Sequence, residues 1–242
     1  MAMDEDAKKK IQIVLALAIL IAAVRTAYIL YERHEDAVQQ NKTAEAPPLN
    51  PDYYVTPKKL YPYDLKSAKQ LTQQPVWAKV GYRYPYFNYN PTTHHSDFAK
   101  EVGLLLPLQK LAIQDVVIDK APDSGNSRQV FAVFEQEGKP YTVQIGTVED
   151  NDYKFFSDAM FFVEDPRDLY KHWPADIWDS ITRHEMKPGM NELQADFAIG
   201  LGIPEKQADE AWKTVHYPNG GNPLTVTYHN GKATEVKPDK AS

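Results

Sequence analysis

The histidines are the first side chains to consider, because imidazole serves both as a metal ligand and as a general base near neutral pH. His94 and His95 are adjacent and Asp97 follows closely, while His184 precedes Glu185. A zinc site needs three or four ligands converging on one point, and the run 184–188 lacks the H-E-x-x-H spacing of a helical two-histidine site. We therefore interpret the histidines as surface or hydrogen-bonded residues and expect neither metal nor cofactor; the others are His34, His172, His216 and His229.

Nucleophilic catalysis has no local motif in this chain. A serine hydrolase of the common strand-turn-helix type carries G-x-S-x-G, and a phosphate-binding loop is rich in glycine at fixed spacing. Neither pattern occurs, and the glycine pair Gly220 and Gly221 fits a hairpin turn. We predict no catalytic residue.

The most site-like stretch combines acids with large aromatic residues. Its acids are Asp158, Glu164, Asp165, Asp168 and Asp176, and its aromatic side chains are Phe161, Phe162, Tyr170, His172, Trp173 and Trp178. Two carboxylates about 5–9.5 Å apart hydrolyse glycosides, so a glycan-binding protein or hydrolase is one interpretation. The other is a hydrophobic core with carboxylates at helix starts, where the helix dipole favours them. We take Tyr170, Trp173 and Trp178 as candidate binding residues.

A second set of candidate binding residues is rich in tyrosine and interrupted by proline. Tyr82, Tyr84, Tyr86 and Tyr89 lie between Pro75 and Pro91. Prolines at this density disfavour long helices and central strands, which predicts an extended, turn-rich arm. Two interpretations stay open: the arm wraps its own body with the rings inward, or it exposes an aromatic surface to a glycan, a lipid headgroup layer or a partner protein.

Composition excludes several classes of protein. The 242 residues include no cysteine, which rules out a disulfide scaffold, thiolate metal sites, a cysteine nucleophile and a lipidated N-terminal cysteine. The formal net charge of −6 argues against a nucleic-acid binder, which usually presents a basic face.

Residues 11–31 predict a membrane span. The run from Ile11 to Val24 is apolar except for Gln12, and it resumes after Arg25 and Thr26. At ~1.5 Å per residue this helix measures roughly 31 Å, the thickness of a bilayer core. Lys8 to Lys10 precede it, so the positive-inside rule leaves the remainder of the chain outside the cytoplasm. A cleaved signal peptide and a buried soluble helix are the competing interpretations; we favour an uncleaved anchor because a small-x-small site is missing just after the run.

The remaining pattern predicts an α+β body. Periodicity and turn residues predict a short helix at 65–72 and a hairpin of strands 129–134 and 141–145. The stretch 154–163 is predicted as a further strand or a buried short helix. Two helices follow at 174–184 and 191–200, and then three antiparallel strands at 211–217, 224–229 and 232–236.

The C-terminal quarter resembles a known envelope module. The residues that carry the resemblance are the run 188–194 (PGMNELQ), the break 202–204 (GIP), Trp212, Tyr217, and the strand end with Asn230, Gly231 and Lys232. This pattern is similar to the BamE/SmpA domain of small outer-membrane lipoproteins. The resemblance implies a helix-on-sheet fold and a non-enzymatic module that binds another envelope protein or a lipid surface, with Trp212 and Tyr217 lying on the sheet under Phe197.

We therefore expect an α+β protein with an N-terminal transmembrane helix, an extended Pro/Tyr-rich arm, a small antiparallel sheet and a C-terminal unit of two helices on a three-stranded antiparallel sheet. The expected boundaries are 1–33 for tail and anchor, 34–102 for linker and arm, 103–163 for the small sheet and 164–242 for the BamE-like unit. The expected role is a single-pass inner-membrane protein with a periplasmic body, serving as a binding or scaffolding subunit of a bacterial envelope complex. Its expected partners are other envelope proteins and, through the anchor, the lipid bilayer, with no nucleic acid.

Overall fold

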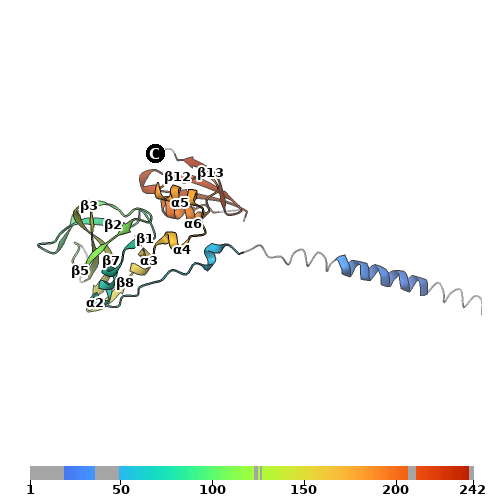
Figure 1. The fold of residues 1–242 in the computed structure, drawn as a ribbon, viewed down its shortest axis with the longest axis horizontal. Helices are drawn as coiled ribbons and strands as arrows, with labels where there is room; N and C mark the ends of the chain where they lie inside the picture. Colours follow the sequence, from blue (N-terminus) through green and yellow to red (C-terminus); the bar gives the residue numbers. More distant parts are fainter. Residues whose placement is uncertain (1–18, 36–48, 123–124, 126, 207–210, 240–242) are drawn as a thin grey trace, which may run out of the picture. The chain divides into compact units, whose positions relative to one another are not determined.

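A computed structural model describes residues 19–35, 49–122, 125, 127–206 and 211–239 (Figure 1). The chain divides into two compact units, residues 1–53 and 54–242. In the first unit residues 19–35 are helical, and the 3₁₀ turn η1 (Pro51–Tyr54) begins at its end. Among the described residues, no helix combines the length and the apolar character needed to cross a membrane. The predicted span starts at Ile11, and its residues 11–18 lie outside the described part.

The second unit confirms the α+β class. Its largest sheet is antiparallel with the order β3-β2-β7-β6-β5, and β8 pairs with β7 (Figure 1). The strands are β2 (Pro85–Asn90), β3 (His95–Leu104), β5 (Ile113–Asp119), β6 (Arg128–Gln136), β7 (Lys139–Glu149) and β8 (Asp152–Phe155). The hairpin predicted from residues 129–134 and 141–145 is therefore confirmed as β6 and β7.

The expectation of an extended arm over residues 34–102 is wrong for its second half. Strands β2, most of β3 and β1 (Val76–Ala78) fall within this range, after the short helix α2 (Leu65–Ala68) and the 3₁₀ turn η2 (Lys69–Gln73) that match the predicted helix 65–72. The prolines do not interrupt the pairing, because Pro85 is the first residue of β2 and Pro91 follows its last residue. Proline is tolerated at the first position of a strand, so its density misled the prediction.

The six-stranded sheet curls until its two edge strands meet. Asp119 at the end of β5 accepts hydrogen bonds from the Ser96 backbone N–H at 2.7 Å and from His95 Nδ1 at 2.9 Å, both on β3. Burial alone raises the pKa of Asp119, but hydrogen bonds from Ser96, His95 and Lys120 outweigh it and hold the pKa below its usual value. The Asp119 carboxylate thus links the edge strands β3 and β5 at a point where they do not pair through their backbones.

The first core lies on one face of this sheet. It includes the β6 residues Val130, Ala132 and Phe134, and it is covered by α2, η2 and β1; its other fully buried members include Ala68, Leu71, Val76, Leu105, Ile145, Met160 and Phe161. Phe131 of β6 faces the other side, where its ring lies 5.3 Å from that of Phe98. Strand β6 therefore has both faces covered, which explains its nearly continuous apolar sequence.

The C-terminal part forms a helix-on-sheet unit. Its helices are α5 (Ala175–Thr182) and α6 (Glu192–Ile199), and its antiparallel sheet has the order β10-β11-β12-β13. Asn191 caps α6 in a capping box with Gln194, and Gly200 ends it with a positive φ of 83°. The sheet strands are β10 (Ile203–Pro204), β11 (Trp212–Tyr217), β12 (Leu224–His229) and β13 (Lys232–Pro238), and the turn η3 (Asn219–Gly221) joins β11 to β12. The two-residue β10 adds a fourth strand to the predicted three.

The second core lies between these helices and the sheet. It contains Phe197, Tyr217 and Tyr228, and the two tyrosine hydroxyls are hydrogen-bonded at 2.8 Å. The expectation for Trp212 is wrong: this side chain is 47% exposed and stacks on His229. Trp212 and Tyr217 are five residues apart on one strand, and such positions point to opposite faces.

A third, three-stranded sheet joins the two cores. It has the order β4-β1-β9, with β4 at Lys110–Leu111 and β9 at Phe161–Phe162. In β9, Phe161 belongs to the first core and Phe162 to the second; in β1, Val76 belongs to the first and Trp77 packs against the second. The stretch 154–163, predicted as a strand or a short helix, contains both, since α3 (Ser157–Met160) separates β8 from β9.

Asp196 is the most perturbed carboxyl group in the second core. It lies on α6 one turn after Glu192, and the Gly202 backbone N–H donates to it. Burial and the negative charge of Glu192 raise the pKa of Asp196 to about 7, against the opposing effects of Gly202 and Lys213. The folded state thus binds this proton more tightly than the unfolded chain does, and the contribution of Asp196 to the free energy of unfolding increases as the pH falls from 8 towards 5.

We predict that Asp196→Asn raises the free energy of unfolding at pH 8 by about 1–3 kcal/mol, because the buried charge disappears while an oxygen acceptor for Gly202 remains. The gain should shrink towards pH 5. Urea unfolding of the full chain in detergent at pH 5–8 measures the difference between variant and parent. Asp168→Asn, at an exposed position, is the control and should stay within about 0.5 kcal/mol of the parent. An equal or lower stability of Asp196→Asn at pH 8 would contradict this prediction.

Candidate functional site

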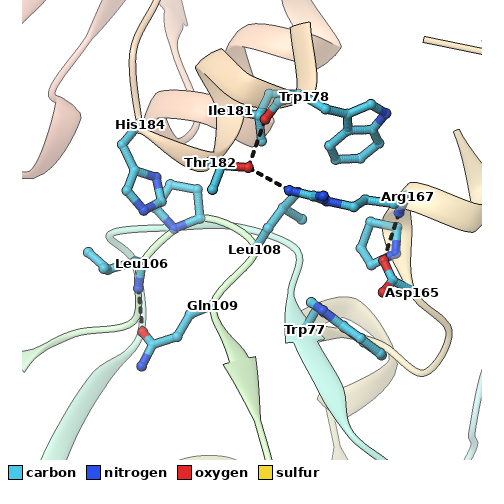
Figure 2. Close-up of a pocket in the computed structure, with 12 residues that line it drawn as sticks. Trp77, Leu106, Leu108, Gln109, Asp165, Arg167, Trp178, Ile181, Thr182 and His184 are labelled. Carbon is cyan, nitrogen blue, oxygen red and sulfur yellow. Dashed lines mark hydrogen bonds between the residues drawn. The ribbon is translucent and has the colours of Figure 1, made fainter. Parts of the chain in front are cut away.

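A pocket of about 260 Å³ opens beside the three-stranded sheet that joins the cores (Figure 2). Its walls come from β1, the loop before β4, the short helix α4 (Pro166–Leu169) and the end of α5. The lining residues are Trp77, Leu106, Pro107, Leu108, Gln109, Asp165, Pro166, Arg167, Trp178, Ile181, Thr182 and His184. The pocket is smaller than the ~300–1,000 Å³ usual for cofactors and drug-sized ligands, so it fits a single large side chain or chain end.

Arg167 is the dominant charged group in the pocket. Its Nη2 donates to Thr182 Oγ1 at 2.7 Å, and that hydroxyl donates in turn to the Trp178 carbonyl oxygen at 2.7 Å (Figure 2). The guanidinium carbon lies 5.7 Å from the centre of the Trp178 ring, a cation–π contact. Helix α4 positions the backbone, because the Asp165 carboxylate caps it by accepting from the Arg167 N–H at 2.9 Å.

The opposite wall is a tight loop held by Gln109. The side-chain oxygen of Gln109 accepts from the Leu106 N–H at 2.8 Å, and its Nε2 donates to Gln136 at 3.1 Å. Leu108 has a positive φ of 50°, which is costly for a leucine and requires support from its surroundings. His184, at the rim, also has a positive φ of 55°, and its Nδ1 lies 3.0 Å from the Ala198 carbonyl oxygen. The loop and the rim are thus fixed by internal hydrogen bonds.

The aromatic candidates separate into core and pocket residues. Tyr170 and Trp173 are buried in the second core, with ring centres 4.5 Å apart. Trp178 is also largely buried, yet it lines the pocket beside Arg167. Of the three predicted residues, only Trp178 is therefore placed where a ligand could contact it.

The acids of the same stretch have structural roles. Asp165 caps α4, and Glu164 accepts from Lys58 through both its backbone N–H and its ammonium, each at 2.9 Å. The hydrogen bond from Lys187 lowers the pKa of Asp176, and Asp168 is exposed on α4. This arrangement matches a core with carboxylates at helix starts, and it does not favour the alternative of a glycan hydrolase.

The four tyrosines between residues 82 and 89 do not form one surface. Tyr86 packs edge-on against Phe134 in the first core, and Tyr89 is buried with its hydroxyl 3.2 Å from His94 Nδ1. Tyr82 lies against the backbone of the η3 turn, where a Cβ placed on Gly220 would come within 2.6 Å of its ring. Tyr84 is half-buried at a separate apolar pocket of about 200 Å³, and burial raises its pKa. Their role in binding stays a prediction.

The histidines described below are hydrogen-bonded or stacked, and His34 is exposed, in agreement with their interpretation as surface or hydrogen-bonded residues. His95 pairs with Asp119, His216 lies 2.6 Å from Glu205 and 2.7 Å from Thr225, and His229 stacks on Trp212. Within the described ranges, no cluster of three or more histidine, aspartate or glutamate side chains is arranged to hold a metal ion.

Sequence reasoning missed Arg167, Trp77 and Leu108. The local signal for Arg167 is the run Asp165, Pro166, Arg167, in which a capping acid and a proline begin a helix and fix the direction of the next side chain. Trp77 and Leu108 carry no such signal, because their position depends on the pairing of β1 with β4.

Comparison with known proteins gives no relative for this chain. No family model matches it, and no match was found among curated proteins or among solved structures.

We predict that Trp173→Ala destabilises the protein by about 3–5 kcal/mol, because it leaves a cavity among Tyr170, Trp178 and Phe197. Trp212→Ala is the matched control on the exposed face and should cost at most about 1 kcal/mol. Urea unfolding at pH 7 compares the two variants. Equal costs would show that Trp173 is not a core residue and would restore it as a candidate for binding.

Proposed function

We propose that this chain is a membrane-anchored, non-enzymatic binding subunit of a bacterial envelope complex, and that the Arg167 pocket receives a segment of its partner. The observation that carries this proposal is the pocket itself: a guanidinium with unused hydrogen-bond donors lies over the Trp178 ring, in a hollow that Trp77 also lines. Arg167 is exposed at the mouth of this hollow, and arginine and tryptophan are among the residue types that contribute most to protein–protein binding.

The membrane anchor is supported by the sequence and by the exposure of the first helix. Residues 11–31 are mostly apolar and follow three lysines. On helix 19–35 the side chains of Ile19, Leu20, Ile21, Val24, Ile29 and Leu30 are all exposed. Apolar residues exposed all around a helix are costly in water and are covered by lipid in a bilayer.

The envelope setting rests on the lysines before the anchor and on the BamE-like pattern. The lysines orient the body away from the cytoplasm. The order of elements in the C-terminal unit, two helices followed by antiparallel strands, agrees with the fold that the resemblance implies. We extend only the helix-on-sheet fold and the envelope setting to this chain, and the partner is proposed as another envelope protein.

We predict that a photo-crosslinking amino acid at Leu106, on the pocket rim, gives an adduct of discrete mass that sediments with the membrane fraction. The same group at Val102 on β3 is the matched control, since Leu106 and Val102 are 40% and 39% exposed. Crosslinking is done with the full-length chain in its bacterial host. An adduct from Leu106 alone is the expected result. Equal adducts from both positions, or none from Leu106, would contradict the proposal.

A further inference from the structure

The Arg167 guanidinium is largely unused within the protein. A guanidinium carries five N–H donors in a planar fork that matches a carboxylate. Among the residues that the structure describes, Thr182 is the one hydrogen-bond acceptor of this group, and no ion pair involves it. The cation–π contact with Trp178 and the Thr182 bond hold the fork in place without neutralising it. Its remaining donors are therefore available to an anionic group in the pocket.

A second polar group with opposite character lines the same pocket, at the backbone end of Arg167 (Figure 2). Asp165 Oδ1 accepts from the Arg167 N–H, while for Oδ2 the described residues offer no donor. The pocket thus presents a set of donors at the guanidinium end of Arg167 and an acceptor at its backbone end. A simple anion would use only the first of these and would be repelled by the second.

We infer that the pocket binds the C-terminal residue of a partner polypeptide. The α-carboxylate of such a residue pairs with the Arg167 fork, and its backbone N–H donates to Asp165 Oδ2. An apolar side chain on the same residue packs against Trp77, Trp178 and Ile181. The volume of about 260 Å³ accommodates one large residue. This inference rests on the proposed function and adds the chemistry by which the partner is recognised.

The competing source of a carboxylate is an aspartate or glutamate inside a partner segment. Such a side chain supplies the charge but not the adjacent N–H in the same geometry. Three peptides separate the two: acetyl-Ala-Ala-Phe with a free C-terminus, the same peptide as its C-terminal amide, and acetyl-Ala-Glu-Phe-amide. The last two differ only in the middle residue, where glutamate in place of alanine adds an internal carboxylate.

The test measures binding of these peptides to the full-length chain in detergent by saturation-transfer NMR titration up to 10 mM. We expect the free acid to bind at least about tenfold more tightly than either amide, because charge-assisted hydrogen bonds are lost in the amides. Arg167→Gln should reduce binding of the acid to the level of the amide, and Arg167→Lys should give an intermediate value, since lysine keeps the charge without the fork. Arg128→Gln, on an exposed residue outside the pocket, is the control and should bind like the parent. Near-ultraviolet circular dichroism confirms that each variant is folded.

Several outcomes would overturn the inference: equal binding of acid and amide, no effect of Arg167→Gln, no binding below 10 mM, or equal binding of the internal-glutamate peptide. These failures are distinguishable from failure of the proposed function. If the Leu106 adduct persists in Arg167→Gln, the pocket contacts a partner but does not depend on binding a C-terminal carboxylate through Arg167. If the parent chain gives no Leu106 adduct, the proposed function itself is wrong.

Discussion

Successive side chains of a β-strand point to opposite faces, and in β1 and β9 these faces belong to two different cores. Val76 and Phe161 enter the core under the six-stranded sheet, whereas Trp77 and Phe162 face the core under α6. The two strands pair directly, with Trp77 opposite Phe162. A shift of one residue in either strand would exchange the cores that its side chains enter, so this register is strongly specified. Both hydrophobic cores therefore depend on the five residues of β1 and β9.

The Arg167 pocket is a consequence of this junction. One wall is Trp77 on β1, and the loop from Leu106 to Gln109 leads directly into β4, which pairs with β1. The other walls are α4, which follows β9 closely along the chain, and the end of α5. The walls come from elements next to the paired strands β4, β1 and β9. Hydrogen bonds fix the Leu106–Gln109 loop through Gln109, and they fix Arg167 through Thr182 and Asp165. A site built in this way is formed before a ligand arrives, which lowers the entropic cost of binding.

Local sequence signals predicted the elements whose cause is local. The helices α5 and α6 and the β6–β7 hairpin follow from residue types at fixed spacing, and each falls within the range that the sequence predicted. The strands β1 to β3 were mistaken for an arm because proline density was interpreted without knowing that Pro85 and Pro91 bracket a strand. The pocket was missed for a related reason: Trp178 was found through its aromatic neighbours, but Trp77 lines the same pocket only through the pairing of β1 with β4 and β9, which lie far from it in the sequence.

The most direct measurement is hydrogen exchange of the full-length chain in detergent as a function of urea, followed by mass spectrometry of peptides. If β1 and β9 make one body of the two cores, peptides from β6 in the first core and from α6 in the second lose protection at the same urea midpoint. Two separate midpoints would contradict the joining role of the three-stranded sheet, and with it the view that the walls of the Arg167 pocket are held together before a partner binds.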